Sequence, residues 1–211
     1  MFRRLFAGLA VALLAMPVMA QPGSFIEMGA INSISNDYNV PDAFNVTQIA
    51  GSTIQWYRFD ISQDTGAAGF FFDIDTSSTS ATLLPDTEIG LYDNLGNFIA
   101  TDDDDGHSLL SALSFGNTTP RTLPVDPFGF TNGSAANGRD GNLNAGSYWL
   151  AVGLFNTTFG TNNWTVTSTS TATPSAYQVN FRTDLFAIPE PGTLIALGLC
   201  GLGLVVRRRR V

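Results

Sequence analysis

The residues best suited to chemistry are four consecutive aspartates at positions 102–105, which are followed by Gly106. Adjacent carboxylates repel one another unless a cation or open solvent relieves the repulsion, and calcium, which binds oxygen ligands, is the natural candidate. An EF-hand is excluded by spacing. With Gly106 at the sixth loop position, Thr101 and Ala112 fall at the first and twelfth positions, where carboxylates are required.

A calcium site in this chain must therefore gather its ligands from separate loops. In an extended segment alternate side chains face opposite ways, so at most two of the four aspartates reach one ion unless the loop bends. The alternative is a solvated acidic turn without a bound ion. The expected ligands, together with backbone carbonyls, are Asp86, Asp93, Asp102 and Asp104.

Catalytic residues are few. His107 is the single histidine and lies beside Ser108, but neighbours in sequence seldom meet in the geometry of a Ser-His-Asp triad, so we expect a turn histidine. Glycosidases need two carboxyl groups at a fixed separation, and in a chain this acidic a pair such as Asp73 and Glu88 can always be imagined. We expect no enzymatic activity; the alternative is a surface hydrolase acting on matrix polysaccharide or peptide.

Aromatic side chains offer a different chemistry, because a flat ring can contact a sugar. Most aromatic residues in strands belong to the core, and we expect this of Trp149. Trp164 lies between polar residues, after Asn162 and Asn163, and is the better candidate for ligand binding.

The segments that must position these residues are short, apolar or alternating, and separated by Gly, Asn, Asp, Ser and Thr. This pattern predicts an all-β fold, an antiparallel β-sandwich of the jelly-roll kind, with a hydrophobic helix at each end of the chain. Tyr177, Val179 and Phe181 are expected to face the core while the polar residues between them face outward. A hairpin is expected over 88–101. The eight expected strands are 53–61, 69–75, 88–93, 98–102, 109–115, 147–155, 164–171 and 177–183.

Charge narrows the possible partners. The chain has 211 residues and its ten basic residues are all arginine, six of them near the two ends. Residues 21–186 hold 4 arginines and 17 acidic residues, a balance of 4 − 17 = −13, which disfavours nucleic acid as a partner. One Cys and one His exclude a disulfide framework and a Cys/His zinc site.

The N-terminus has the pattern of a secretory signal peptide. Two arginines precede an apolar run, and small residues before position 21 suit cleavage between Ala20 and Gln21. We therefore expect residues 1–20 to be removed, leaving residues 21–186 as a folded domain outside the cytoplasm.

The C-terminal tail combines Pro189, Glu190 and Pro191, an apolar run over 193–206, and an arginine cluster. Fourteen helical residues span about 21 Å, less than the roughly 30 Å hydrocarbon core, and the arginines favour a cytoplasmic end. This predicts a transient anchor in the inner membrane; the alternative is an ordinary single-pass tail that is retained. The cluster consists of Arg207, Arg208, Arg209 and Arg210.

These three parts, over 187–211, resemble the PEP-CTERM sorting signal. The resemblance implies processing by an exosortase, an integral-membrane cysteine protease that cleaves near the Pro-Glu-Pro and passes the protein on to the cell surface. It also implies a Gram-negative bacterium that produces exopolysaccharide, with the protein in its extracellular biofilm matrix.

The stretches 56–59, 91–96 and 145–152 resemble a second family, the bacterial pre-peptidase C-terminal domain, over about 53–152. That resemblance implies a jelly-roll sandwich with a binding or accessory role and no catalysis. The segment 116–144 has no counterpart in that family, and its Gly, Asn and Pro content predicts a long flexible loop.

Overall fold

The structure is a computed structural model, and its described residues hold the folded domain. None of them belongs to a helix with the length and hydrophobicity that a membrane crossing requires. The predicted signal peptide with its Ala20–Gln21 cleavage site, the helices at the two ends and the sorting tail all include residues outside the described part. The described residues are 21–31, 44–47, 54–66, 69–82, 84–123, 126, 128–171 and 176–184.

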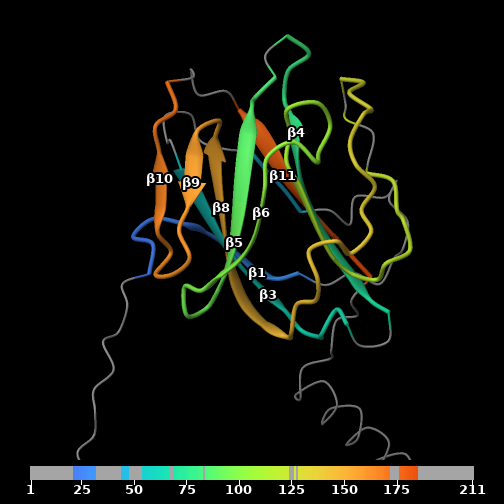
Figure 1. Cartoon of the computed structure of the whole chain (residues 1–211), viewed down its shortest axis with the longest axis vertical. Helices are drawn as coiled ribbons and strands as arrows, with labels where there is room; N and C mark the ends of the chain where they lie inside the picture. The colour runs from blue at the N-terminus through green and yellow to red at the C-terminus, as the bar shows by residue number, and fades with distance from the viewer. Residues whose placement is uncertain are drawn as a thin grey trace, which may run out of the picture.

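Two sheets pack face to face as a β-sandwich (Figure 1). The larger sheet, sheet A, has the strand order β1-β3-β8-β5-β6, and the smaller, sheet B, has the order β2-β11-β4-β7. Sheet A consists of β1 (Ile26–Ala30), β3 (Ile54–Ile61), β8 (Gly146–Leu154), β5 (Thr87–Asp93) and β6 (Phe98–Asp102). Sheet B consists of β2 (Phe44–Thr47), β11 (Tyr177–Thr183), β4 (Phe71–Ser78) and β7 (Ala112–Gly116). A separate ribbon pairs β9 (Thr157–Phe159) with β10 (Val166–Ser168).

Alternation along the strands builds the core between the sheets. Every second residue of β3, from Tyr57 to Ile61, is buried against matching residues of β8 and β11. Tyr177, Val179 and Phe181 face this core, as predicted. Burial of these large side chains is the dominant stabilising contribution, at roughly 25 cal/mol per Å² of apolar surface.

The all-β prediction is confirmed, and each of the eight expected strands has a counterpart. The hairpin of β5 and β6 is also present, with Gly96 at φ +81° in its turn. Two details differ. β1 pairs with β3 in parallel, which makes sheet A mixed. The segment expected as a strand from residue 164 starts as β10 only at Val166, because Asn163 and Trp164 have positive φ and form a turn.

The β9–β10 ribbon covers the outer face of sheet A, beside β8 and β5 (Figure 1). Two glycines make this close approach possible. A Cβ at Gly90 would lie 2.2 Å from the Phe159 ring, and one at Gly153 would lie 2.2 Å from the Thr157 hydroxyl. Glu88 secures the turn that precedes the ribbon by accepting hydrogen bonds from the backbone N–H groups of Asn156 and Thr157.

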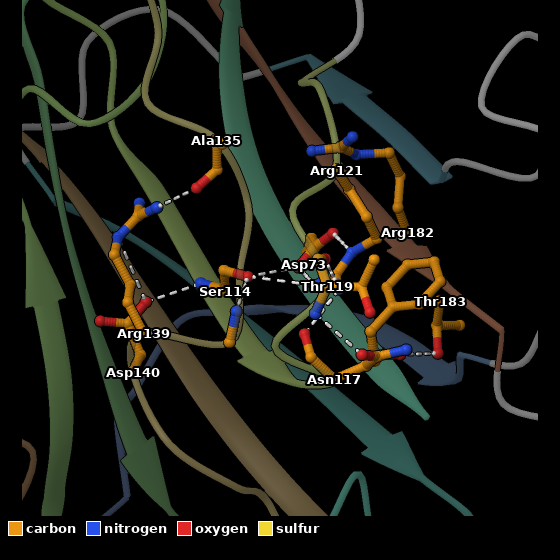
Figure 2. A network of polar contacts seen from close by, with 12 residues as sticks. Asp73, Ser114, Asn117, Thr119, Arg121, Ala135, Arg139, Asp140, Arg182 and Thr183 are labelled. Carbon is orange, nitrogen blue, oxygen red and sulfur yellow. Dashed lines mark hydrogen bonds and ion pairs between the residues drawn. The ribbon is translucent and has the colours of Figure 1, made fainter. Parts of the chain in front are cut away.

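The segment 116–144 covers the outer face of sheet B, and the prediction of a flexible loop was wrong for its described residues. The Arg121 guanidinium donates to both carboxylate oxygens of Asp73 on β4, at 3.1 and 2.9 Å, and Ser114 donates to the same carboxylate at 2.8 Å (Figure 2). Arg121 and Ala136 pair as an isolated β-bridge. Charged hydrogen bonds to the sheet therefore fix a segment that has little regular secondary structure.

Outward-facing polar residues of β11 are also buried. Asn180 and Arg182 point away from the core as predicted, yet they are only 8% and 6% exposed. Both contact Asp75 on the neighbouring strand, Asn180 through a 3.0 Å hydrogen bond and Arg182 through a 2.9 Å ion pair. Burial raises the pKa of Asp75, and the charge of Arg182 acts against that rise.

Candidate acidic binding site

Three carboxylates meet at one end of the β5–β6 hairpin. Asp86 immediately precedes β5, while Asp103 and Asp104 immediately follow β6. The hairpin is antiparallel and pairs Ile89 with Asp102, so the beginning of β5 lies next to the end of β6. One oxygen from each of the three carboxylates lies within 4.8 Å of the others. We call Asp86, Asp103 and Asp104 the acidic cluster.

Negative charge accumulates in this cluster, and no ion pair within the described part of the chain offsets it. Partial burial raises the pKa of Asp86, and the charges of Asp103 and Asp104 raise it further. Burial and the charge of Asp104 likewise raise the pKa of Asp103. None of the ion pairs among the described residues reaches the three side chains. Such an arrangement favours a bound cation, and carboxylate oxygens are ligands that calcium prefers.

Asp102 has a different role from the cluster, although it is adjacent in sequence. Its carboxylate accepts hydrogen bonds from the backbone N–H groups of Ala112, at 2.7 Å, and Asp105, at 3.1 Å, which holds the acidic loop against β7. Burial raises the pKa of Asp102 to about 7. Burial also acts to raise the pKa of Asp105, but hydrogen bonds from Ser134 and Asp102 and the charge of Arg139 outweigh it, so that pKa is lowered. The two carboxyl groups are thus coupled, and Asp102 keeps its proton to a higher pH than Asp105.

The four expected metal ligands do not all come together. Asp86 and Asp104 lie in the acidic cluster, as the prediction required, and Asp103 takes the place expected for Asp102. Asp93 lies at the opposite end of β5, where it accepts hydrogen bonds from the N–H groups of Leu95 and Asn97 in the hairpin turn. Strand alternation favoured positions 102 and 104. That argument fails because β6 ends at Asp102 and the chain then bends.

A pocket of about 420 Å³ opens beside the acidic cluster. It lies between the end of the hairpin and the β9 strand, so side chains from three separate stretches of the sequence form its wall. Its lining residues are Glu88, Thr101, Asp102, Asp103, Thr157, Thr158 and Phe159. Burial raises the pKa of Glu88, the hydrogen bonds from Thr157 and Asn156 oppose this, and the charges of Asp103 and Asp86 add to it.

Trp164 does not present its ring to solvent, so the structure contradicts its expected role in ligand binding. It is 8% exposed and packs edge-to-face against Trp149, with ring centroids 6.0 Å apart. Its ring also lies over Gly96, where a Cβ would approach to 2.7 Å. The polar neighbours that suggested exposure belong to the turn at Asn163, which folds the indole inward. Trp149 is fully buried, as expected.

His107 is a turn histidine, as expected. It is 8% exposed, and its Nδ1 accepts a hydrogen bond from the backbone N–H of Gly133 at 3.1 Å. Ser108 has φ +64°, and its backbone N–H donates a hydrogen bond to the side-chain oxygen of Asn132. These contacts attach the acidic loop to the segment 116–144.

Comparison with known proteins identifies the tail. Residues 187–210 match the PEP-CTERM protein-sorting motif. The chain therefore carries a PEP-CTERM sorting signal. The signal directs export across the inner membrane to the cell surface or extracellular space, with processing by an exosortase at the membrane. The match includes Pro189, Glu190, Pro191 and the arginines of the cluster up to Arg210.

One solved structure that the comparison matches to this chain is the pre-peptidase C-terminal domain of a collagenase from Bacillus anthracis. The match has 13% sequence identity and a TM-score of 0.39, and it covers 77% of this chain and 99% of that one. No curated protein is detectably similar in sequence to this chain.

Proposed function

We propose that this protein is a non-catalytic binding module of the cell surface or extracellular matrix of an exopolysaccharide-producing, Gram-negative bacterium. The observation that carries the proposal is the sorting signal at 187–210, attached to a β-sandwich domain. In the domain the single histidine is fixed by Gly133 and the buried acids are fixed by arginines or backbone N–H groups. Groups held in this way support the fold.

An experiment that measures both polysaccharide binding and polysaccharide cleavage distinguishes this function from the alternative, a surface hydrolase. The full-length chain is incubated with polysaccharide extracted from its host, and bound protein and released products are both measured. Retention without product release is the expected result. Product release that disappears in a single carboxylate variant, such as Glu88→Gln, would establish the hydrolase and overturn the proposal.

The export step has its own test. Mass spectrometry of the protein recovered from the cell surface should show a mature form that lacks its last twenty or so residues, because an exosortase cleaves near the Pro-Glu-Pro. A surface protein that still ends at Val211 would show a permanently anchored protein instead.

We further propose that the acidic cluster holds calcium. The support is the mutual approach of the three carboxylates to within 4.8 Å, together with the absence, among the described residues, of an ion pair to any of them. Calcium takes six to eight oxygen ligands, so backbone carbonyls and water complete the shell.

Calorimetric titration of the full-length chain with calcium chloride tests this site. Asp104→Asn should weaken calcium binding at least tenfold. Glu27→Gln is the matched control, since it removes one exposed carboxylate from β1, at the opposite edge of sheet A from β6, and should leave binding unchanged. Equal binding by both variants, or none by the parent chain, would exclude the site.

A further inference from the structure

The pocket beside the acidic cluster offers mainly hydrogen-bond acceptors. The two carboxylate oxygens of Glu88 are oriented by backbone N–H groups, at 3.1 Å from Asn156 and 2.6 Å from Thr157. Each oxygen has more than one lone-pair direction, so both can still accept from a ligand. Asp102 and Asp103 add further carboxylate oxygens to the same wall.

The threonines of the pocket also offer mainly hydrogen-bond acceptors. The Thr101 hydroxyl donates to the Ile89 carbonyl at 2.7 Å, and the Thr157 hydroxyl donates to the Leu154 carbonyl at 2.7 Å. A hydroxyl has one proton, so these two can only accept from a ligand. Thr158 is exposed, and its hydroxyl makes no hydrogen bond to another described residue. Among the threonines that line the pocket, it is the one whose hydroxyl proton remains available.

A ligand that satisfies this lining must bring several donors and must not bring negative charge. Glu88 and Asp103 line the pocket and Asp86 lies in the adjoining acidic cluster, so an anionic ligand meets like charges at close range. A ligand rich in hydroxyl or ammonium groups meets acceptors instead.

Phe159 supplies an apolar surface in the same wall. Its ring lies against Gly90 on the sheet, and the residue is partly exposed and lines the pocket. The ring of a sugar combines hydroxyl donors around its rim with an apolar C–H face, so it matches both parts of this lining. The volume of about 420 Å³ is within the range of small-molecule sites and accommodates a single sugar unit with part of its neighbour.

We propose that this pocket binds one unit of a polysaccharide whose sugar carries hydroxyl or ammonium donors and no negative charge. The proposal rests on the binding function proposed above and specifies its ligand class. Glu88, Asp102 and Asp103 accept from the sugar, Thr158 donates to it, and Phe159 packs against its C–H face. Uronates are rejected by the carboxylates.

Calorimetric titration with short oligomers of glucose, glucosamine and glucuronate tests the ligand class. The full-length chain is kept soluble in a detergent without a sugar headgroup, and EDTA removes calcium, so that failure of the calcium site does not affect the result. Binding of the glucose or glucosamine oligomer at least tenfold more tightly than the glucuronate oligomer is expected; glucosamine alone would identify the amine as the recognised group. Equal or tighter binding of glucuronate, or no binding of any oligomer, would overturn the proposal.

Variants locate the binding in this pocket. Thr158→Val keeps the side-chain shape and removes the hydroxyl, and it should weaken binding of the preferred oligomer about fivefold. Thr167→Val is the matched control, because Thr167 is exposed on β10 directly opposite Thr158 in the ribbon and does not line the pocket. Equal effects of the two variants would exclude this pocket as the site.

A third variant tests the charge argument separately from folding. Asp103 is exposed, so Asp103→Asn leaves the fold intact while it removes one negative charge from the wall. The preference against the glucuronate oligomer should shrink severalfold. An unchanged preference would contradict the role assigned to the carboxylates. Loss of all sugar binding leaves the tail-processing assay unaffected, so the ligand and the export route fail independently.

Discussion

The aspartates on the outer face of sheet B and those beside sheet A differ in their burial and in their charged partners. On sheet B, Asp73 and Asp75 are almost fully buried, and each pairs with an arginine at 2.9 Å. Beside sheet A, Asp86, Asp103 and Asp104 approach one another at the surface, and no arginine of the described part reaches them. The same side chain therefore stabilises the fold on one face and leaves charge uncompensated on the other.

The difference shows which acids are available for binding. A buried carboxylate without a partner is costly, so an arginine must accompany it into the fold and its oxygens are then occupied. Exposed carboxylates cost little in stability, so they can remain together without a partner and attract a cation or a ligand rich in donors. In this protein the acids that pair with an arginine stabilise the fold, whereas the acids without such a partner form the candidate site.

Breaking the buried pair on sheet B should give the largest effect. Arg121→Met leaves the carboxylate of Asp73, which is fully buried, without its counter-charge, and it also detaches the segment 116–144 from β4. We expect a loss of about 3–5 kcal/mol in the free energy of unfolding, measured by urea denaturation.

A double variant distinguishes the lost charge balance from lost packing. Asp73→Asn combined with Arg121→Met removes both charges and should recover a substantial part of the stability. If the double variant is no more stable than Arg121→Met alone, the contact of Arg121 with the Phe71 ring, 4.3 Å away, would account for the effect instead.

Substitution at Gly90 should give the next largest effect, on the ribbon that forms one wall of the pocket. A Cβ at Gly90 would lie 2.2 Å from the Phe159 ring, so Gly90→Ala forces that ring outward. We expect a destabilisation of about 1–3 kcal/mol and weaker sugar binding. Gly23→Ala is the control, because nothing lies within 4 Å of its added Cβ. Equal stability of the two variants would show that the ribbon is not seated against β5.

Much of the fold follows from local sequence, as β11 illustrates. Tyr177, Val179 and Phe181 alternate with polar residues, and this alternation alone identifies their face. The parallel pairing of β1 with β3 has no such local signal, since it depends on register between distant segments. The burial of Asn180 and Arg182 could likewise not be predicted from local sequence, because their partner Asp75 lies 105 and 107 positions away.

The Asp102–Asp105 pair should make stability depend on pH. Burial raises the pKa of Asp102 to about 7, well above the value of an unfolded aspartate near 4, so the folded state binds a proton more tightly than the unfolded state. The contribution of Asp102 to the free energy of unfolding is therefore complete below about pH 4, and it is lost as the pH rises through about 7. In EDTA we expect a decrease of about 1–2 kcal/mol between pH 5 and pH 8, after allowance for partial exposure.

Asp102→Asn provides the comparison for this pH effect. The amide oxygen can still accept the hydrogen bonds from the N–H groups of Ala112 and Asp105, but the side chain no longer titrates. The slope of unfolding free energy against pH should flatten over the same interval. A slope that persists in this variant would assign the effect to other acids.

Only part of the candidate site could be predicted from the sequence. The repulsion within the aspartate run suggested an ion shared with Asp86, and the antiparallel hairpin does bring these segments together. Asp103 was missed because alternation applies only while a strand continues, and the strand ends at Asp102. The pocket was not predictable, because β9 is three residues long and its position depends on two glycines of other strands.

The smallest expected effect is also the one that most directly contrasts the two faces. Without calcium, Asp104→Asn removes one charge from the acidic cluster and relieves repulsion on Asp86 and Asp103, so it should stabilise the protein by about 0.5 kcal/mol. With calcium in excess the sign should reverse, because ligand binding to the folded state stabilises only the chain that retains the site. Thermal unfolding of the parent and the variant, each in EDTA and in calcium, measures both signs. A variant that is less stable in EDTA would mean that Asp104 supports the fold as Asp73 does, and the distinction between partnered and unpartnered acids would then fail at this position.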